Sequence, residues 1–326
     1  MVQLMGENMM RKDGDAHIVE RQQAQPTFSP ATVKRIWIGL FKQDTENIIN
    51  KLRDRDKFDV VSDFAMPVSA SALRHVTGLT NLTLTQMDAV SQAMIDGIAN
   101  YSGDATIENR CRSATQRIDD SIEEMLQSES TPRTSMISVL TQAGQPLENI
   151  RANIKLAISG GQNEPRDAIA GTIATLLSHP EQLTRLNSGD VPWLNAFEEY
   201  ARWMSPIGMS PRRIVKPFVW NGIEFQPETK AFLMFGSANR DEEIFEEPDR
   251  FDVTRKTSKS VSFGAGPHFC AGAAISRALI AEVALPLFFK HFPDVALAGE
   301  VAYRGWAFRG PISVPVRLNM ASDKKI

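Results

Sequence analysis

The sequence predicts a mainly helical protein with a small β portion, built as a single domain over residues 1–326. Apolar residues recur at three- and four-residue spacing through the first two thirds of the chain, and short strand-like stretches follow only after that. No internal repeat or linker separates independent units. With 42% hydrophobic and 23% charged residues, the 326-residue chain can bury one large core or two moderate ones.

The charge balance and the cysteines exclude several classes of protein. Lys and Arg total 36 against 39 Asp and Glu, a net charge of −3, which excludes a strongly basic nucleic-acid binder. The two cysteines, Cys111 and Cys270, lie far apart and form no C-x-x-C pair, so we expect no disulfide framework and treat Cys111 as structural. No window approaches the ~18 apolar residues of a membrane span, so a cytoplasmic protein without membrane or nucleic-acid partners is expected.

Helical patterns dominate the first part of the chain. Ser29 and Pro30 provide a cap and a first-turn proline for a long amphipathic helix that continues through Leu52. Further helices are predicted over residues 70–76, 84–98, 113–126, 194–203 and 271–289, with a polar loop at 128–133. Short strands are predicted over 213–218, 222–225 and 231–235 as one small sheet, and around 296–318, with an irregular stretch over 237–260.

A nearly continuous helical pattern over residues 148–177 is interrupted at 159–165, which reads SGGQNEP. A glycine pair and a proline inside an apolar helix cost several times ~1 kcal/mol in propensity and lost hydrogen bonds, so something must compensate. Two interpretations stay open. The segment is either two helices joined by a turn, or one helix bulged open where it passes a ligand.

Residues 262–272 form a glycine-rich loop that leads directly into a helix and places Cys270 at the helix start. Backbone N–H groups and the positive end of a helix lower the pKa of a thiol. Glycines at 264, 266 and 272 let the main chain approach a flat ligand or a sulfur atom closely. This combination suits metal ligation by sulfur.

Other interpretations of this loop explain less. Gly264 and Gly266 could open a dinucleotide fingerprint, but the third glycine and the β-α-β context are missing. Cys270 with His268 as its base could be a nucleophile, yet the two residues are too close along a tight turn to pair easily. A buried structural cysteine does not explain the glycines.

Residues 263–272 match the haem-binding signature F-x-x-G-x-x-x-C-x-G, and the chain thereby resembles the cytochrome P450 monooxygenases. Three more elements occur in the family's order: His17 to Arg21 fits H-x-x-x-R, Glu199 to Arg202 fits E-x-x-R, and residues 248–251 (PDRF) fit the meander. Alone, E-x-x-R carries no weight, because Glu and Arg three residues apart are a common exposed helix pair. Its position before the cysteine loop supplies the weight.

The resemblance implies a P450 fold that holds haem b, with Cys270 as the axial thiolate on iron and Phe263 shielding the sulfur from water. It implies that Gly264, Gly266 and Gly272 shape the haem loop. The residues implied to neutralise the haem propionates by charge-assisted hydrogen bonds are His17, Arg21, His268 and Arg212, or Arg213 in place of Arg212. The implied buried ion-pair network joins Glu199, Arg202 and Arg250.

The family's oxygen-binding helix motif, A/G-G-x-D/E-T, reads GGQNE over residues 160–164, so Asn163 replaces the acid and Glu164 the alcohol. We hypothesise that burial raises the pKa of Glu164, that Glu164 supplies protons for oxygen reduction, and that Asn163 positions a water beside it. The altered motif also leaves peroxide-driven chemistry open.

The resemblance covers the chain from about Met9 to the C-terminus, whereas family members usually begin with an N-terminal sheet and further helices. We therefore expect an N-terminally truncated P450 fold. A truncated gene model, a degenerate copy and a shortened protein with a more open haem pocket all stay possible.

The implied activity is insertion of one oxygen atom of O2 into a C–H bond of a small hydrophobic or aromatic substrate. The chain has no flavin or nicotinamide signature, so a ferredoxin or flavodoxin with an NAD(P)H-dependent reductase is the implied electron source. Residues 10–14 and 160–167 look similar to a bacterial subgroup that includes aromatic O-demethylases. Hydroxylation of a terpenoid, fatty acid or steroid stays open, as does a non-catalytic or peroxide-dependent haem-binding homologue.

Overall fold

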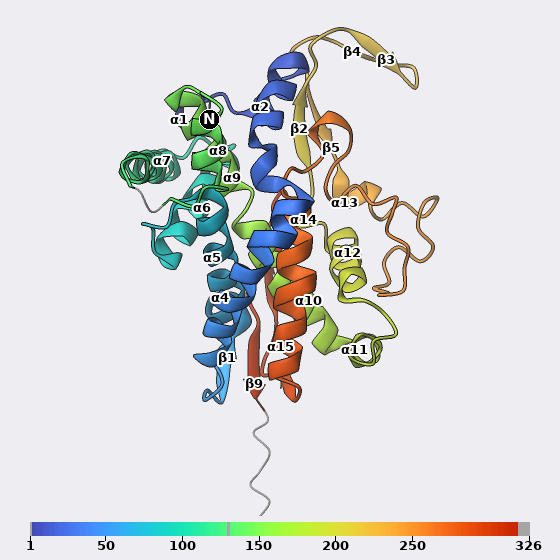
Figure 1. Ribbon diagram of the computed structural model, residues 1–326. Helices are drawn as coiled ribbons and strands as arrows, with labels where there is room; N and C mark the ends of the chain where they lie inside the picture. Colours follow the sequence, from blue (N-terminus) through green and yellow to red (C-terminus); the bar gives the residue numbers. More distant parts are fainter. Residues whose placement is uncertain (1, 129–130, 319–326) are drawn as a thin grey trace, which may run out of the picture.

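The computed structural model describes residues 2–128 and 131–318, and these ranges are mostly helical with small antiparallel sheets (Figure 1). The helices are α1 (Val2–Met5), α2 (Gly14–Phe28), α3 (Pro30–Thr32), α4 (Ile38–Asn50), α5 (Met66–Thr77), α6 (Leu84–Ile98), α7 (Ala105–Leu126), α8 (Met136–Gln142), α9 (Leu147–Ser159), α10 (Asn163–Ser178), α11 (Pro180–Asn187), α12 (Trp193–Met204), α13 (Phe235–Ala238), α14 (Ala273–Arg277) and α15 (Leu285–His291). Wider π-type turns occur over Val33–Trp37, Val60–Ala65 and Ala278–Ala284, and 3₁₀ turns over Met9–Arg11 and Gly266–His268.

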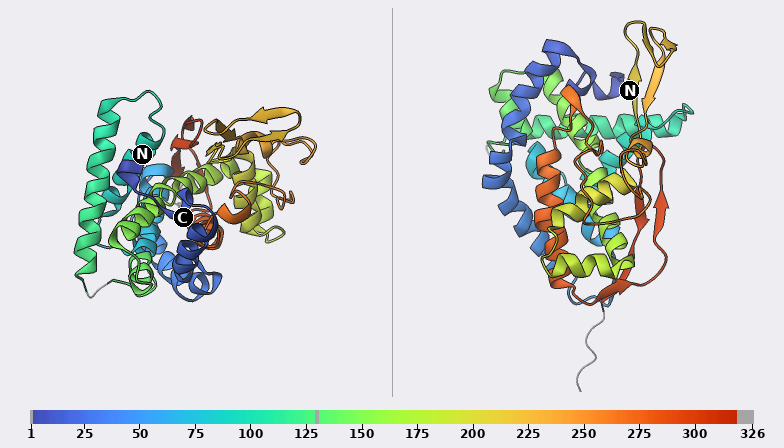
Figure 2. Two further views of the ribbon diagram at one scale, coloured as in Figure 1. Left: turned by 90° about the horizontal axis from the view of Figure 1, so that it is seen from above. Right: turned by 90° about the vertical axis from the view of Figure 1, so that its right-hand side faces the viewer.

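The strands are β1 (Lys57–Asp59), β2 (Ser210–Arg213), β3 (Phe218–Trp220), β4 (Ile223–Phe225), β5 (Lys230–Leu233), β6 (Val295–Leu297), β7 (Ala302–Arg304), β8 (Gly310–Ser313) and β9 (Pro315–Leu318). β9 lies between β1 and β6 in an antiparallel sheet, with Phe58 opposite Val316. The expected single sheet over 213–235 is wrong in detail. β2 pairs with β5, while β3 and β4 form a separate hairpin that extends from the body (Figures 1 and 2).

Local capping explains where the helix predictions hold. The predicted helix 84–98 is α6, closed by a capping box between Thr83 and Gln86. The predicted piece 70–76 is the end of α5, and Gly78 terminates it at φ +90°. α7, the long teal helix of Figure 2, starts before the predicted residue 113, because the Asp104 side chain accepts hydrogen bonds from the first-turn amides. α8 and α11 were not predicted, and residues 129–130 of the predicted loop lie outside the described ranges.

The interruption at 159–165 separates two helices that are joined by a turn. This is the first of the two interpretations given above. α9 ends at Ser159 and α10 starts at Asn163. A Cβ at Gly161 would lie 2.4 Å from the carbonyl oxygen of Ala157, so the turn requires glycine there. The apolar face of α9 belongs to one hydrophobic cluster and that of α10 to the other, so the turn lies where the two clusters meet.

A fully buried ion pair on α12 holds the irregular segment after α13. Glu199 and Arg202 have no exposed surface, and their side chains form two hydrogen bonds of 2.7 and 2.8 Å. Arg202 also donates to the carbonyl oxygens of Asn239, Pro248 and Arg250. A buried charge without partners is costly, and this geometry satisfies both groups.

The third member of this network is Arg255, which corrects the expectation for Arg250. Arg255 donates from Nε to Glu199 at 3.1 Å and its side chain is only 11% exposed. The Arg250 side chain is 59% exposed and pairs with Glu247 at 2.9 Å. Only the backbone of Arg250 joins the network, because its side chain points to the surface side of the segment. The sequence offers several arginines in this irregular stretch, and spacing alone does not choose among them.

Asn239 connects the ion pair to the cysteine loop, and no sequence motif identified it. It is fully buried, and its carbonyl oxygen accepts from Arg202. Its side chain accepts from the amide of Val261 and the hydroxyl of Ser260, and donates to Ser262. The start of the cysteine loop is therefore fixed through Asn239 to the buried pair on α12.

No helix within residues 2–128 and 131–318 is long and apolar enough to cross a membrane.

Arg255→Ala should lower the free energy of unfolding by about 3 kcal/mol, because it leaves the buried Glu199 carboxylate with one cation fewer. Arg250→Ala is the matched control and should change it by less than about 0.5 kcal/mol, because an exposed pair contributes little. Urea denaturation of both variants measures the difference. Equal losses, or a larger loss for Arg250→Ala, would show that the third partner is not Arg255.

A glycine contact between α10 and α12 gives a second prediction. A Cβ at Gly171 would lie 1.7 Å from the hydroxyl oxygen of the fully buried Tyr200, so Gly171→Ala should destabilise the fold by about 1–3 kcal/mol. Gly39 of α4 is exposed with open space at its Cβ, so Gly39→Ala should stabilise by about 0.5–1 kcal/mol. Thermal unfolding of the two variants tests the opposite signs.

Candidate functional site

The cysteine loop is a tight turn that requires its glycines. The amide of Cys270 donates to the carbonyl of Phe263 at 2.9 Å and closes the loop. Gly264 and Gly266 have φ angles of +70° and +67°, a region that side chains disfavour. A Cβ at Gly266 would meet nothing within 4 Å, so this edge of the loop borders open space. The loop can therefore lie flat against a planar ligand.

Cys270 is exposed, while Cys111 is buried in the core as expected. The pKa of the Cys270 thiol is nevertheless raised, chiefly by desolvation, against the lowering effect of the Gly272 amide and the charges of Arg21 and Arg277. The Cys270 thiol is thus accessible to solvent but is largely surrounded by protein. The sequence predicted a lowered pKa for the Cys270 thiol, but in this structure desolvation outweighs the lowering effect of the helix end. A coordinated metal would deprotonate the thiol outright.

Aromatic rings and a guanidinium form one wall beside the loop. The Phe263 ring lies 6.1 Å from the ring of Phe197 and 6.3 Å from that of Phe269. The guanidinium carbon of Arg277 stands 4.8 Å from the centre of the Phe263 ring. Phe263 is thus half-buried and held on three sides, which suits the shielding role expected for it.

Cationic side chains from α2 gather beside the same loop. The rings of His17 and His268 lie 4.1 Å apart, and Arg21 donates to the carbonyl of Phe269 at 2.5 Å. Desolvation and the positive charges of His268 and Arg21 lower the pKa of His17. A cavity of about 270 Å³ adjoins them, lined by His17, Ile18, Arg21, Gln22, Gln25 and Pro267. Such a cluster favours a bound carboxylate, which would raise the pKa of His17 again.

Arg212 makes local contacts in this structure, and its expected role toward a haem propionate stays a prediction. Its guanidinium donates to the hydroxyl of Ser210 and the carbonyl of Pro211 within its own strand β2. Arg213, the alternative, pairs with Glu228 across the turn at 3.2 Å. Both side chains are exposed, because β2 belongs to a two-stranded ribbon that leaves them at its surface.

Glu164 lies in the first turn of α10, and neither of its carboxylate oxygens has a hydrogen-bond partner among the described residues. Burial raises its pKa to about 7, with a further upward contribution from Asp167 against the lowering effect of its own backbone amide and of Arg166. The charge of Glu164 also contributes to the raised pKa of Cys270, after desolvation. A buried, unpaired carboxyl with this pKa can hold and release a proton near neutral pH.

Asn163 bonds to two side chains of a neighbouring helix, and its expected role in positioning a water beside Glu164 stays a prediction. Its side-chain oxygen accepts from Ser91 at 3.2 Å, and its amide donates to Gln92 at 3.0 Å. Both partners lie on α6. Asn163 therefore ties the start of α10 to α6, because its side-chain amide both accepts and donates a hydrogen bond there.

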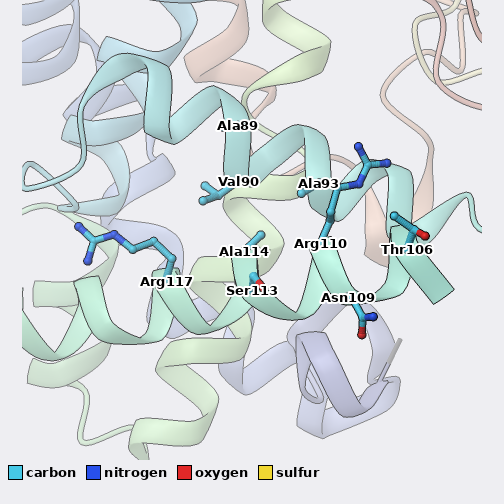
Figure 3. Close-up of a pocket in the computed structure, with 9 residues that line it drawn as sticks. All are labelled: Ala89, Val90, Ala93, Thr106, Asn109, Arg110, Ser113, Ala114 and Arg117. Carbon is cyan, nitrogen blue, oxygen red and sulfur yellow. The ribbon is translucent and has the colours of Figure 1, made fainter.

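A larger cavity, of about 580 Å³, lies between α6 and α7, away from the cysteine loop (Figure 3). Its lining consists of Ala89, Val90, Ala93, Thr106, Asn109, Arg110, Ser113, Ala114 and Arg117. It contains none of the residues predicted from the sequence motifs, so its size alone does not mark the functional site.

The residues around Cys270 fit a haem. The thiol is accessible to solvent, glycines leave room for a flat ligand, and His17, Arg21 and His268 would face the carboxylates at its edge. Within the described residues, no group of three or more His, Cys, Asp and Glu could hold a bare metal ion.

Comparisons with known proteins agree with this geometry. Residues 187–293 match the family model described as Cytochrome P450. The chain is 26% identical to cytochrome P450 107B1 of Saccharopolyspora erythraea over 96% of its own length and 78% of the relative's. It is 27% identical to the steroid C26-monooxygenase of Mycolicibacterium smegmatis, covering 94% and 78%.

A solved structure agrees as well: P450BioI in complex with acyl carrier protein carrying hexadec-9Z-enoic acid superposes with a TM-score of 0.87 at 25% identity, covering 95% of this chain and 81% of that one. The expected mainly helical P450 fold is thereby confirmed. A cysteine in a glycine loop, a cationic cluster beside it and these likenesses lead to one conclusion: the chain has the cytochrome P450 fold, and its sequence is similar to those of bacterial cytochrome P450 monooxygenases.

Proposed function

We propose that this protein binds haem b through Cys270 and inserts one oxygen atom of O2 into a C–H bond of a small hydrophobic substrate. The observation that carries the proposal is the exposed Cys270 thiol in a glycine loop, beside the cluster of His17, Arg21 and His268. When bound, the haem supplies O2 activation and oxygen-atom transfer. The protein supplies ligation, orientation and protons.

The side chains of this chain divide these tasks. His17, Arg21 and His268 would orient the haem by charge-assisted hydrogen bonds to its propionates. Asp13 already bonds the ring of His268 at 3.0 Å and holds it in place. Phe263 excludes water from the sulfur side. Glu164 holds a proton at its carboxyl oxygen and delivers it during oxygen reduction.

The electron source and the substrate are narrower parts of the proposal. The sequence has no flavin or nicotinamide signature, which supports a ferredoxin or flavodoxin with an NAD(P)H-dependent reductase, docking near the cysteine loop. The names of the relatives refer to steroid oxidation, polyketide biosynthesis and biotin biosynthesis, and these support a hydrophobic substrate. Aromatic O-demethylation is a further candidate that rests on the sequence likeness of residues 160–167.

Cys270→Ala tests the ligand. The dithionite-reduced wild-type protein with carbon monoxide should show the strongly red-shifted Soret band of thiolate-ligated haem, because sulfur donates electron density to iron. The variant should lose that band entirely. Cys111→Ala is the matched control and should keep it, because Cys111 lies in the core. A band that survives in Cys270→Ala would overturn the assignment.

Glu164→Gln tests the proton donor. Product formed per O2 consumed should fall at least about tenfold, since a positioned general acid contributes roughly 10²–10⁴-fold. In the wild type this ratio should decline as pH rises through about 7, because Glu164 then loses its proton; the variant should lack that decline. The assay uses a ferredoxin-based redox system and whichever methoxy-aromatic, fatty acid or steroid gives a substrate-binding spectral shift.

Unchanged coupling in Glu164→Gln would contradict the role of Glu164. Product formation driven by hydrogen peroxide, with none from the redox system, would favour the peroxide-dependent alternative instead.

A further inference from the structure

Two acidic side chains on α10 have opposite surroundings. Glu164 and Asp167 are three residues apart and therefore share one helix face. Asp167 accepts a hydrogen bond from Nε of Arg166 at 2.8 Å, whereas the oxygens of Glu164 have no partner among the described residues. One carboxylate is thus paired with a cation and the other is not.

Arg166 is shared between two acids. Its Nη1 lies 3.0 Å from Asp88 of α6, and its own side chain is only 8% exposed. Gln162 donates to the same oxygen of Asp88 at 3.0 Å. Arg166 is therefore held from both sides, and Asp88 and Asp167 are matched partners of one buried guanidinium.

Close packing confines Asp167. A Cβ at Gly310 of β8 would lie 2.4 Å from both Cβ and Cγ of Asp167, so the bare backbone of β8 presses on this side chain. The carboxylate has little room to turn away from Arg166. The charge of Asp167 is consequently held about one helical turn C-terminal to Glu164.

We propose that Asp167, held by Arg166, is a positioning residue that keeps Glu164 in its acid form, so that a proton is available beside the haem. The inference rests on the proposed role of Glu164. A fixed negative charge on Asp167 disfavours ionisation of a second carboxyl on the same helix face. In such a pair one carboxyl stays charged and the other keeps its proton.

The electrostatics of the surrounding groups support this assignment. The charge of Asp167 raises the pKa of Glu164, and Asp88 is not among the groups that shift it. Burial raises the pKa of Asp167 itself, and Arg166 opposes that shift and favours the charged form. The other titratable or charged groups that act on Glu164, Arg166 or Asp167 are Cys270 from the cysteine loop, Asp88 from α6, Arg304 from β7 and Tyr200 from α12.

The test is an infrared titration of the haem-loaded protein, in which Glu164→Gln identifies the C=O band of the protonated Glu164. In Asp167→Asn the midpoint of this band should fall by about 0.5–1 pH unit, since the nearby negative charge is gone. Asp88→Asn also removes one carboxylate from Arg166, but it should leave the midpoint unchanged. If Asp167→Asn does not retain haem, Asp167→Ala should give the same downward shift.

An unchanged midpoint in the neutral Asp167 variants, or an equal shift in Asp88→Asn, would overturn the proposal. The band reports the protonation of Glu164 and not turnover, so these failures are distinct from those of the proposed function. That function fails instead if the carbon monoxide spectrum does not depend on Cys270.

Discussion

The buried pair of Glu199 and Arg202 is the interaction on which the C-terminal part of the molecule depends. Two charges without exposed surface must find all their partners inside the protein, because an unpaired buried charge costs several kcal/mol. The Glu199 carboxylate therefore accepts hydrogen bonds from Arg255 and from the amide of Asp252. Arg202 donates to three backbone carbonyl oxygens of the irregular segment. Through Asn239 the same network reaches the start of the cysteine loop.

The site is assembled from segments that meet only in the folded protein. α2 supplies the cations, the cysteine loop supplies the thiol, and the start of α10 supplies the proton-bearing carboxyl. The turn at residues 160–162 lies between two hydrophobic clusters, and this position buries Glu164 without giving it a partner.

The motifs predicted chemistry more reliably than contacts. The structure brings His17 and Arg21 beside the cysteine loop, and the shape of that loop depends on glycines close together in the sequence. The prediction for the Arg250 side chain was wrong, since it was assigned by spacing to Glu199, which lies far along the chain. Long-range pairing of a flexible arginine leaves no local signal.

The sequence by itself determined the helical class, the limits of α6, the glycine turn and the resemblance to cytochrome P450, because these follow from periodicity, capping and a contiguous motif. Tertiary structure alone decided that Arg255 completes the network, that Asn239 connects it to the cysteine loop, and that Arg166 is shared by Asp88 and Asp167. The physical reason is that burial, and with it the need for a charged partner, arises only when distant segments pack together.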